Sequence, residues 1–237
     1  MKRGPASFDR LARIYRGLEF LAFGRDLERA RFCLLDRLAG CRDILVLGEG
    51  DGRCLARLLR AAPAARVHCL DASAAMLARA AARVPEAEVP RVAFTRADAI
   101  EAPLPEAGYD AVVTLFFLDC FTGAQAGTIV AKAARALRPG SRWLFADFAL
   151  PPAGLRRLRA RAWLALLYGF FRWQTALPAR SLPPSEDLIA GAGFRPASVR
   201  EFQHGLLRAV LFEGPSAAGC SGPAGRASHP DGPSAPG

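Results

Sequence analysis

The feature that most constrains the fold is a continuous apolar run, Asp43–Leu47 (DILVL), which passes directly into glycines at alternate positions, Gly48, Gly50 and Gly52. An apolar run of this length without alternation is typical of a strand buried on both faces of a parallel sheet. Leucines at helical spacing follow at once. Glycines between a strand and a helix let a ligand approach the N–H groups at the start of the helix. The segment therefore predicts an α/β sheet with a ligand at this turn.

Strand and helix patterns alternate from residue 43 to residue 146. Further apolar runs predict strands at 66–70, 91–95, 109–115 and 142–146, with helices at 55–62, 73–84 and 124–137 between them. Two more runs, 197–203 and 206–212, flank His204-Gly205, whose spacing predicts a two-residue hairpin turn. The chain is therefore expected to form a doubly wound, mostly parallel, seven-stranded Rossmann-like sheet that ends in an antiparallel hairpin.

Composition divides the 237 residues into three parts. Residues 1–40 show helical spacing and predict an N-terminal helical cap, with a stop at Gly40; residues 41–213 form the sheet domain, with a helical insertion at 152–184. Residues 214–237 consist mostly of Gly, Pro, Ala and Ser, which predicts a disordered tail. The longest uncharged apolar stretch, 162–171, is shorter than the roughly 20 residues that a membrane-spanning helix needs. Because the N-terminus also lacks a secretory signal, a cytoplasmic location is expected.

Charge and cysteine usage exclude further classes. The formal net charge of +10 would suit nucleic acid or an anionic surface, but the chain has only two lysines and its arginines are scattered along the sequence. A nucleic-acid footprint is therefore disfavoured. The six cysteines form no CxxC pair and no zinc-type grouping with histidine, so no metal is predicted. Cys54 and Cys69 stand in apolar segments and are expected in the core.

The glycine turn carries the chemistry. Asp71 ends the second predicted strand 23 positions after Gly48, where a carboxylate can accept both ribose hydroxyls of an adenosine. A nicotinamide or flavin fingerprint requires a third glycine at position 53, which is arginine here. Glu49 and Asp51 place two carboxylates in the turn, which disfavours a diphosphate and favours a cationic ligand such as a sulfonium.

With these residues the chain resembles the class I S-adenosylmethionine-dependent methyltransferases, from about Phe8 to Phe212. The segments that carry the resemblance are 46–52, 70–73 with Met76, 97–99, 103–105, 109–113 and 136–141. Residues 9–15 (DRLARIY) resemble the Asp-x-x-Ala-x-x-Tyr segment of the branch that contains the ubiquinone and menaquinone biosynthesis C-methyltransferases. The resemblance implies S-adenosyl-L-methionine as cofactor and a methyl acceptor as substrate.

The resemblance also implies roles for individual residues. Gly48 and Gly50 would shape the loop under the methionine moiety, Asp71 would hold the ribose, and Asp98 would accept a hydrogen bond from the adenine amino group. The remaining expected contacts are Ala72 beside Asp71, Ala99 and Met76 against the adenine ring, Leu115 and Phe116 at the sulfonium end, and Tyr15, for which a core position fits equally well. The family usually has an acidic residue two positions before the first glycine, where this chain has Val46. Glu49 is then the expected charge contact to the cofactor's amino group.

Residues after strands four and five are the candidates for catalysis, because ligands of open α/β sheets bind at the carboxyl ends of the strands. Asp119 and Asp147 stand at these positions and could act as a general base. His204 is expected to serve the hairpin turn, and Cys120 has no histidine placed to activate it.

Residues 155–173 are rich in aromatic and aliphatic side chains and begin with four arginines. They predict a lid over a hydrophobic or lipid-like acceptor, a helix lying peripherally on an anionic membrane, or a core helix. Three other functions stay open: a non-catalytic S-adenosylmethionine-binding protein, a nucleic-acid methyltransferase and, less favoured because of Arg53, an NAD(P)-dependent oxidoreductase.

Overall fold

The structure of the chain is a computed structural model that describes residues 24–151, 153–155, 157–163 and 182–216. Tyr15 lies outside the described residues, as do most of the expected cap, much of the insertion and most of the tail. The strands are β1 (Asp43–Leu47), β2 (Arg66–Asp71), β3 (Val92–Arg96), β4 (Tyr109–Leu115), β5 (Leu137–Phe148), β6 (Arg195–Phe202) and β7 (Leu207–Glu213). The helices are α2 (Asp26–Phe32), α3 (Arg53–Ala61), α4 (Ala74–Ala81), α5 (Gly123–Ala136) and α7 (Ser185–Gly191).

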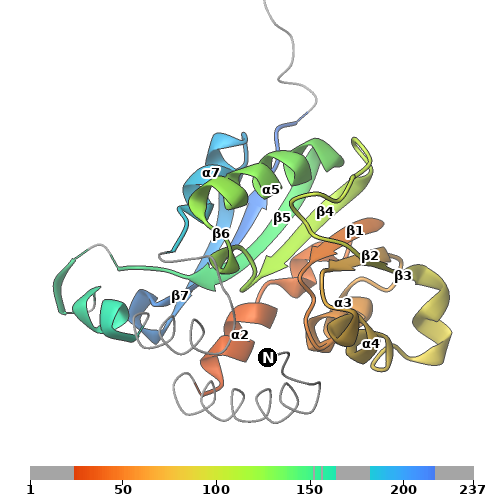
Figure 1. The fold of residues 1–237 in the computed structure, drawn as a ribbon, viewed down its shortest axis with the longest axis horizontal. Helices are drawn as coiled ribbons and strands as arrows, with labels where there is room; N and C mark the ends of the chain where they lie inside the picture. The colour runs from red at the N-terminus through yellow and green to blue at the C-terminus, as the bar shows by residue number, and fades with distance from the viewer. Residues whose placement is uncertain (1–23, 152, 156, 164–181, 217–237) are drawn as a thin grey trace, which may run out of the picture.

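The seven strands form one sheet in the order β3-β2-β1-β4-β5-β7-β6 (Figure 1). The first five strands run parallel, and β7 pairs antiparallel with both β5 and β6. This arrangement confirms the predicted fold class, a doubly wound sheet closed by an antiparallel hairpin. It also places the carboxyl ends of β1, β2, β4 and β5 along one edge, where the predicted site residues lie.

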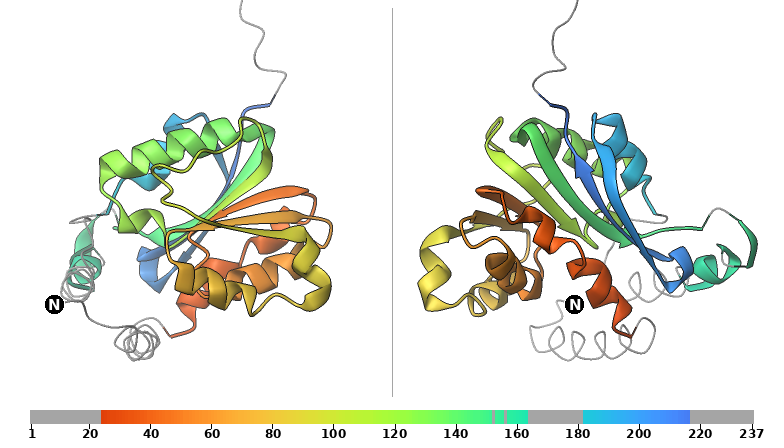
Figure 2. Two further views of the ribbon diagram at one scale, coloured as in Figure 1. Left: turned by 45° about the vertical axis from the view of Figure 1, so that its right-hand side comes forward. Right: turned by 180° about the vertical axis from the view of Figure 1, so that it is seen from behind.

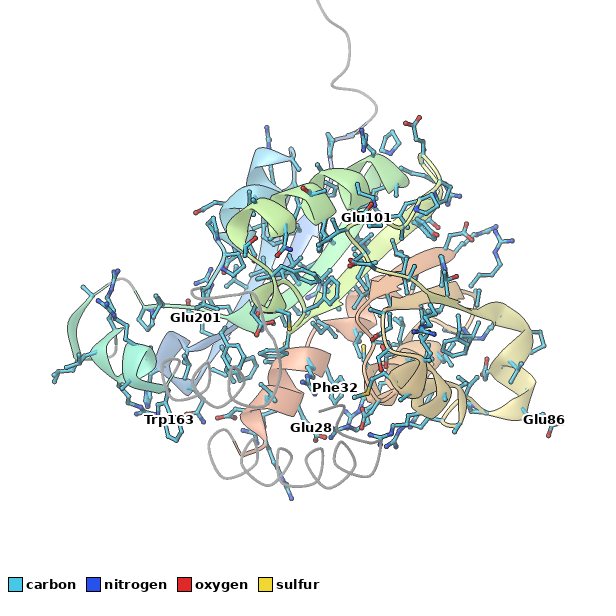
Figure 3. All side chains as sticks on the ribbon, in the orientation of Figure 1. Glu28, Phe32, Glu86, Glu101, Trp163 and Glu201 are labelled. Atoms are coloured by element: carbon cyan, nitrogen blue, oxygen red, sulfur yellow. The ribbon has the colours of Figure 1, made fainter. Side chains whose placement is uncertain are left out.

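Helices cover both faces of the sheet (Figure 2). On one face α3 and the 3-10 turn Leu35–Leu38 pack on β1 and β2, in a core that includes the predicted buried thiols of Cys54 and Cys69. On the other face α5 and α7 pack around the fully buried Trp143, whose indole N–H donates to the Thr114 hydroxyl at 2.9 Å. Helix α2 contacts α3 through two of its side chains, both labelled in Figure 3. Glu28 forms an ion pair with Arg53, and the ring of Phe32 lies under the guanidinium of Arg57.

Three local predictions were wrong. The run before Gly40 is not one helix, because Leu34 leaves helical geometry and separates α2 from the 3-10 turn Leu35–Leu38. Residues 138–140 belong to β5, which starts at residue 137 because β4 and β5 already pair there, ahead of a register shift. The hairpin turn is longer than two residues and spans 203–206, with Gln203 and His204 both at positive φ. His204 does serve this turn.

Arginine neutralises the carboxylates at the amino edge of the sheet. The Arg138 guanidinium donates to Asp43 at 3.0 Å and to Asp110 at 2.6 Å, and Asp110 also accepts from the backbone N–H of Arg42 and Asp43. Partial burial acts against ionisation, but these hydrogen bonds hold the pKa of Asp110 below its ordinary value. Beside this cluster, Gly140 N donates to the carbonyl of Pro215, so the first residues after β7 remain attached to the sheet.

Candidate functional site

The glycine turn adopts the left-handed geometry that glycine permits. Gly48 has a φ of +69° and Gly50 a φ of +71°. A Cβ on Gly48 would lie 2.1 Å from the ring of Phe117, whereas a Cβ on Gly50 would meet nothing within 4 Å. Gly48 is therefore required by close packing against the segment after β4. Gly50 leaves open space above the turn, which is the space a ligand would need.

Asp71 links the turn to the end of β2. One carboxylate oxygen accepts from the Ser73 N–H at 2.8 Å, and the other accepts from the Gly50 N–H at 3.4 Å. The carboxylate therefore faces the glycine turn from the neighbouring strand. Ser73 in turn caps α4, because its hydroxyl accepts from the Met76 N–H.

Glu49 is buried within the turn. One carboxylate oxygen accepts from the N–H of Leu55, the third residue of α3, at 2.7 Å. The other oxygen is buried and has no hydrogen-bond partner among the described residues. Burial raises the pKa of Glu49 to about 8, with a further contribution from the charge of Asp51. Val46, at the position where the family usually has an acid, is 2% exposed inside β1.

The other predicted adenosine contacts lie in the connections after β2 and β3, at the same edge. Asp98 is exposed and its carboxylate accepts from the Ile100 N–H at 2.8 Å. Ala99 is buried, Met76 is half-buried in the first turn of α4, and Ala72 is exposed. The structure thus brings these four residues to the same edge of the sheet as Asp71, on its β2–β3 side.

Aromatic side chains occupy the end of β4. Phe116 follows Leu115 with a φ of +53°, a strained geometry for a bulky residue, and its ring contacts that of Phe148 edge to face at 5.2 Å. The Arg31 guanidinium of α2 lies 5.1 Å from the centre of the Phe116 ring. Sequence reasoning missed Arg31 and Phe117. Phe117 directly follows a predicted site residue, but nothing in the sequence connects Arg31 with this edge.

Asp119 and Asp147 form a close pair, in which Asp147 is buried and Asp119 half-buried. The in-register pairing of Leu115 with Ala146 brings the ends of β4 and β5 together. Asp147 accepts from the N–H groups of Asp119, at 3.1 Å, and Phe148, at 2.8 Å. Burial raises the pKa of both carboxyl groups, that of Asp119 to about 6, and the Asp119 charge adds to the effect of burial on the pKa of Asp147. The pair therefore retains a proton to a higher pH than ordinary carboxyl groups do.

Carboxyl groups thus gather along this edge. Glu49 and Asp71 lie within electrostatic range of each other, and Asp71, Asp119 and Asp147 all act on the Cys120 thiol. Burial and these charges raise the pKa of Cys120, which keeps the thiol protonated and unsuited to nucleophilic attack. The sign of the charge suits a cationic ligand. Among the residues that the structure describes, no group of three or more His, Cys, Asp or Glu side chains could hold a metal ion.

Comparisons with known proteins agree with this geometry. A family described as a methyltransferase domain matches residues 44–140. The demethylmenaquinone methyltransferase of Thermus thermophilus is 32% identical over 188 residues, which cover 73% of this chain and 84% of that protein. The chain belongs to the class I S-adenosylmethionine-dependent methyltransferases. The cofactor of this methyltransferase is S-adenosyl-L-methionine, as the sequence resemblance implies.

Two further matches are to longer proteins. The 27-O-demethylrifamycin SV methyltransferase of Amycolatopsis mediterranei is 37% identical over 138 residues, which cover 54% of this chain and 50% of that protein. The apo crystal structure of the S-adenosylmethionine-dependent methyltransferase SibL superposes with a TM-score of 0.58 at 25% identity, over 85% of this chain and 58% of that one. The methyltransferase thus spans little more than half the length of these two proteins. No helix among its described residues is long and apolar enough to cross a membrane.

Proposed function

We propose that this methyltransferase transfers a methyl group to a small, hydrophobic or lipid-like acceptor at the carboxyl ends of β4 and β5. The observation that carries the proposal is the Asp119–Asp147 pair beside an aromatic wall. Phe116 and Phe148, in edge-to-face contact, belong to an apolar cluster with Trp163, Leu182 and Leu206. An apolar surface with a few polar groups at fixed positions is the usual composition of a small-molecule site.

A cleft beside the end of β5 supports an acceptor of limited size. It has a volume of about 400 Å³ and is lined mainly by residues from the end of β5 and from 182–187, with Asp147 in its wall. On one side of the cleft Arg208 forms a bidentate ion pair with Glu186, in which two guanidinium nitrogens donate to the two carboxylate oxygens at 2.7 and 3.0 Å. The names of the two curated relatives, which refer to demethylmenaquinone and 27-O-demethylrifamycin SV, support a small-molecule acceptor of related character.

The residues present fit the cofactor. Glu49 has an oxygen with no partner among residues 24–151 and the other described segments, Gly50 leaves open space, and Asp71 faces the turn. We assign the methionine end to Gly48, Glu49 and Gly50, the ribose to Asp71 and Ala72, and the adenine to Met76, Asp98 and Ala99, with Leu115 and Phe116 at the sulfonium end. The bound cofactor supplies a methyl group on a positively charged sulfur, which needs no further activation as a leaving group.

The chain's own residues then position the acceptor and handle its proton. The Phe116–Phe148 wall excludes water from the transfer end. The Asp119–Asp147 pair accepts a proton from an acceptor hydroxyl or ring carbon. Because Asp119 must first lose its own proton, turnover should rise as the pH increases through about 6, the pKa of Asp119.

Methyl-labelled S-adenosylmethionine, incubated with the full chain and a lysate separated into lipid, small-molecule, protein and nucleic-acid fractions, identifies the acceptor class. We expect label in the lipid or small-molecule fraction. Label in nucleic acid or protein would overturn the proposed acceptor, and no label in any fraction would favour a cofactor-binding protein without turnover.

Substitutions test the pair itself. Asp147→Asn should lower kcat about 100-fold, a typical contribution of acid–base catalysis, and leave cofactor affinity within about threefold of wild type. The acid limb of the pH profile should stay near pH 6, because burial rather than Asp147 raises the pKa of Asp119. Asp36→Asn, which removes an exposed carboxylate from the 3-10 turn Leu35–Leu38, is the matched control and should change neither quantity. An unchanged kcat in Asp147→Asn would argue against the pair as the base.

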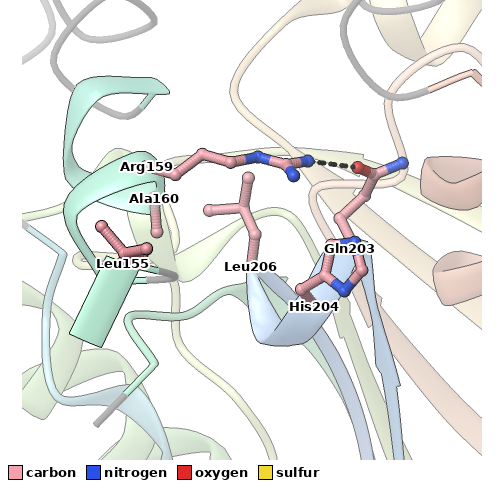
Figure 4. Close-up of a pocket in the computed structure, with 6 residues that line it drawn as sticks. All are labelled: Leu155, Arg159, Ala160, Gln203, His204 and Leu206. Atoms are coloured by element: carbon pink, nitrogen blue, oxygen red, sulfur yellow. Dashed lines mark hydrogen bonds between the residues drawn. The ribbon is translucent and has the colours of Figure 1, made fainter. Parts of the chain in front are cut away.

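Peripheral membrane contact through residues 155–173 is part of the same proposal for a lipid-like acceptor. Leu155 is 84% exposed and Leu158 66% exposed, next to the exposed Arg157, Arg159 and Arg161. A pocket of about 240 Å³ separates this segment from the 203–206 turn, and Arg159 donates across it to Gln203 (Figure 4). Exposed leucines among arginines support contact with an anionic bilayer. Sedimentation with phosphatidylglycerol vesicles, but not with phosphatidylcholine vesicles, would support it, and a Leu155→Asp/Leu158→Asp variant should lose the binding.

A further inference from the structure

We propose that Glu49 is the counter-ion of the cofactor's α-ammonium group and that it releases one proton when the cofactor binds. This inference deepens the proposed function and rests on its cofactor site. It assigns Glu49 two tasks that different oxygens perform. One oxygen accepts a hydrogen bond from the first turn of α3, and the other would pair with the cation.

The geometry separates these two tasks. The oxygen that accepts from the Leu55 N–H fixes the carboxyl group at the first turn of α3. The second oxygen is buried and has no partner within the part of the chain that the structure describes. An ionised carboxylate buried in this way is costly unless a charge pairs with it, so the empty site favours the neutral acid. The rise of the Glu49 pKa to about 8, caused mainly by burial, agrees with this geometry.

The groups around Glu49 leave this role to a ligand. Among the described residues, Arg31 of α2 lowers the pKa of Glu49, and its guanidinium lies over the Phe116 ring. Asp51 is engaged by Arg53 and Arg83, and Asp71 accepts from two backbone N–H groups. Both anions raise the pKa of Glu49 rather than stabilise its charge.

Thiols complete the surroundings of Glu49. Burial raises the pKa of Cys54 in α3 and of Cys69 in β2, so both stay neutral. The ammonium group of the cofactor is therefore the cation that this environment calls for. The position also explains how the chain functions with Val46 in place of the family's usual acid, because Glu49 reaches the same turn three residues later.

Proton release has a measurable consequence. At pH values below about 8 the empty site holds the Glu49 proton and the occupied site does not, so cofactor affinity should rise with pH, by up to about tenfold per pH unit. The cofactor's own amino group begins to lose its proton near pH 8, so the range from about pH 6 to pH 7.5 isolates Glu49.

Calorimetric titration of the full chain in phosphate and in imidazole buffer, at about pH 6.5, measures the protons released from the difference in apparent enthalpy. The probes are S-adenosylmethionine and 5′-methylthioadenosine, which lacks the amino-acid portion. We expect close to one proton for S-adenosylmethionine and none for 5′-methylthioadenosine. Glu49→Gln should abolish the proton release and weaken the binding of S-adenosylmethionine at least tenfold. The affinity for 5′-methylthioadenosine should change by no more than about twofold.

The outcomes separate the two proposals. If S-adenosylmethionine binds without proton release and with pH-independent affinity, the role of Glu49 is overturned and the proposed function stands. If neither probe binds the wild-type chain, the proposed function fails as well. The proton count comes from the wild-type protein, so the test does not depend on the folding of Glu49→Gln.

Discussion

The two halves of the carboxyl edge hold their acids in different ways. On the β1–β2 side, Glu49 and Asp71 are each fixed by backbone N–H groups of a nearby loop or helix. On the β4–β5 side, the backbone N–H of Asp119 donates to Asp147, and the Asp119 charge adds to burial in raising the pKa of Asp147. The β1–β2 side, here called the cofactor half, is therefore organised by local chain geometry. The β4–β5 side, the transfer half, depends on how two strands align.

The largest expected effect is that of substituting Asp71. Asp71→Asn should weaken the binding of S-adenosylmethionine at least 100-fold, because the hydrogen bonds from the two ribose hydroxyls to the charged carboxylate are lost, at about 1.5 kcal/mol each. Asp98→Asn, which alters an exposed carboxylate with one predicted adenine contact, should cost only about tenfold. Fluorescence titration of both variants, with circular dichroism to verify folding, makes the comparison. Equal losses would remove the distinction between Asp71 and Asp98.

Two glycines of one turn should respond differently to the same substitution. Gly48→Ala should destabilise the fold by about 2–4 kcal/mol, because its Cβ overlaps the Phe117 ring at a positive φ. Gly50→Ala should cost about 1 kcal/mol in stability but more in cofactor affinity, since its Cβ enters the open space. Urea unfolding and cofactor titration measure the two effects. Gly48→Ala should cost less stability in a Phe117→Ala background than in the wild-type chain, and an equal cost in both would mean that φ strain alone is responsible.

The smallest effect should link the two halves. Arg31 lowers the pKa of both Glu49 and Asp119, so Arg31→Gln should raise both. Cofactor affinity near neutral pH should then fall about twofold to fourfold, and the acid limb of the turnover profile should move to higher pH in the same variant. Arg57→Gln, whose guanidinium lies over Phe32, is the control and should move neither. A shift in only one of the two measurements would show that Arg31 serves one half alone.

The sequence predicts the parts of this molecule that local chemistry determines. The alternation of strands and helices and the antiparallel end follow from the apolar runs, and Asp71 follows from its spacing after Gly48. The pairing of Asp119 with Asp147 could not be predicted, because it depends on the register of β4 against β5. The same holds for Arg31 and for Phe117 against Gly48, which are tertiary contacts between segments far apart in the chain. The early start of β5 was missed because its residues 138–140 have the composition of a turn.

The arginine cluster at the amino edge has a consequence for the opposite edge. Asp43 and Asp110 share Arg138 there, whereas at the other end of the strands Asp71 and Asp147 accept from backbone N–H groups in the contacts described above. In physiological salt, charges more than about 8 Å away are largely screened. A positively charged nucleoside that approaches this protein, whose net charge is +10, therefore responds to the nearby acids rather than to the overall excess of arginine. A basic chain can in this way maintain a locally negative binding site for a cation.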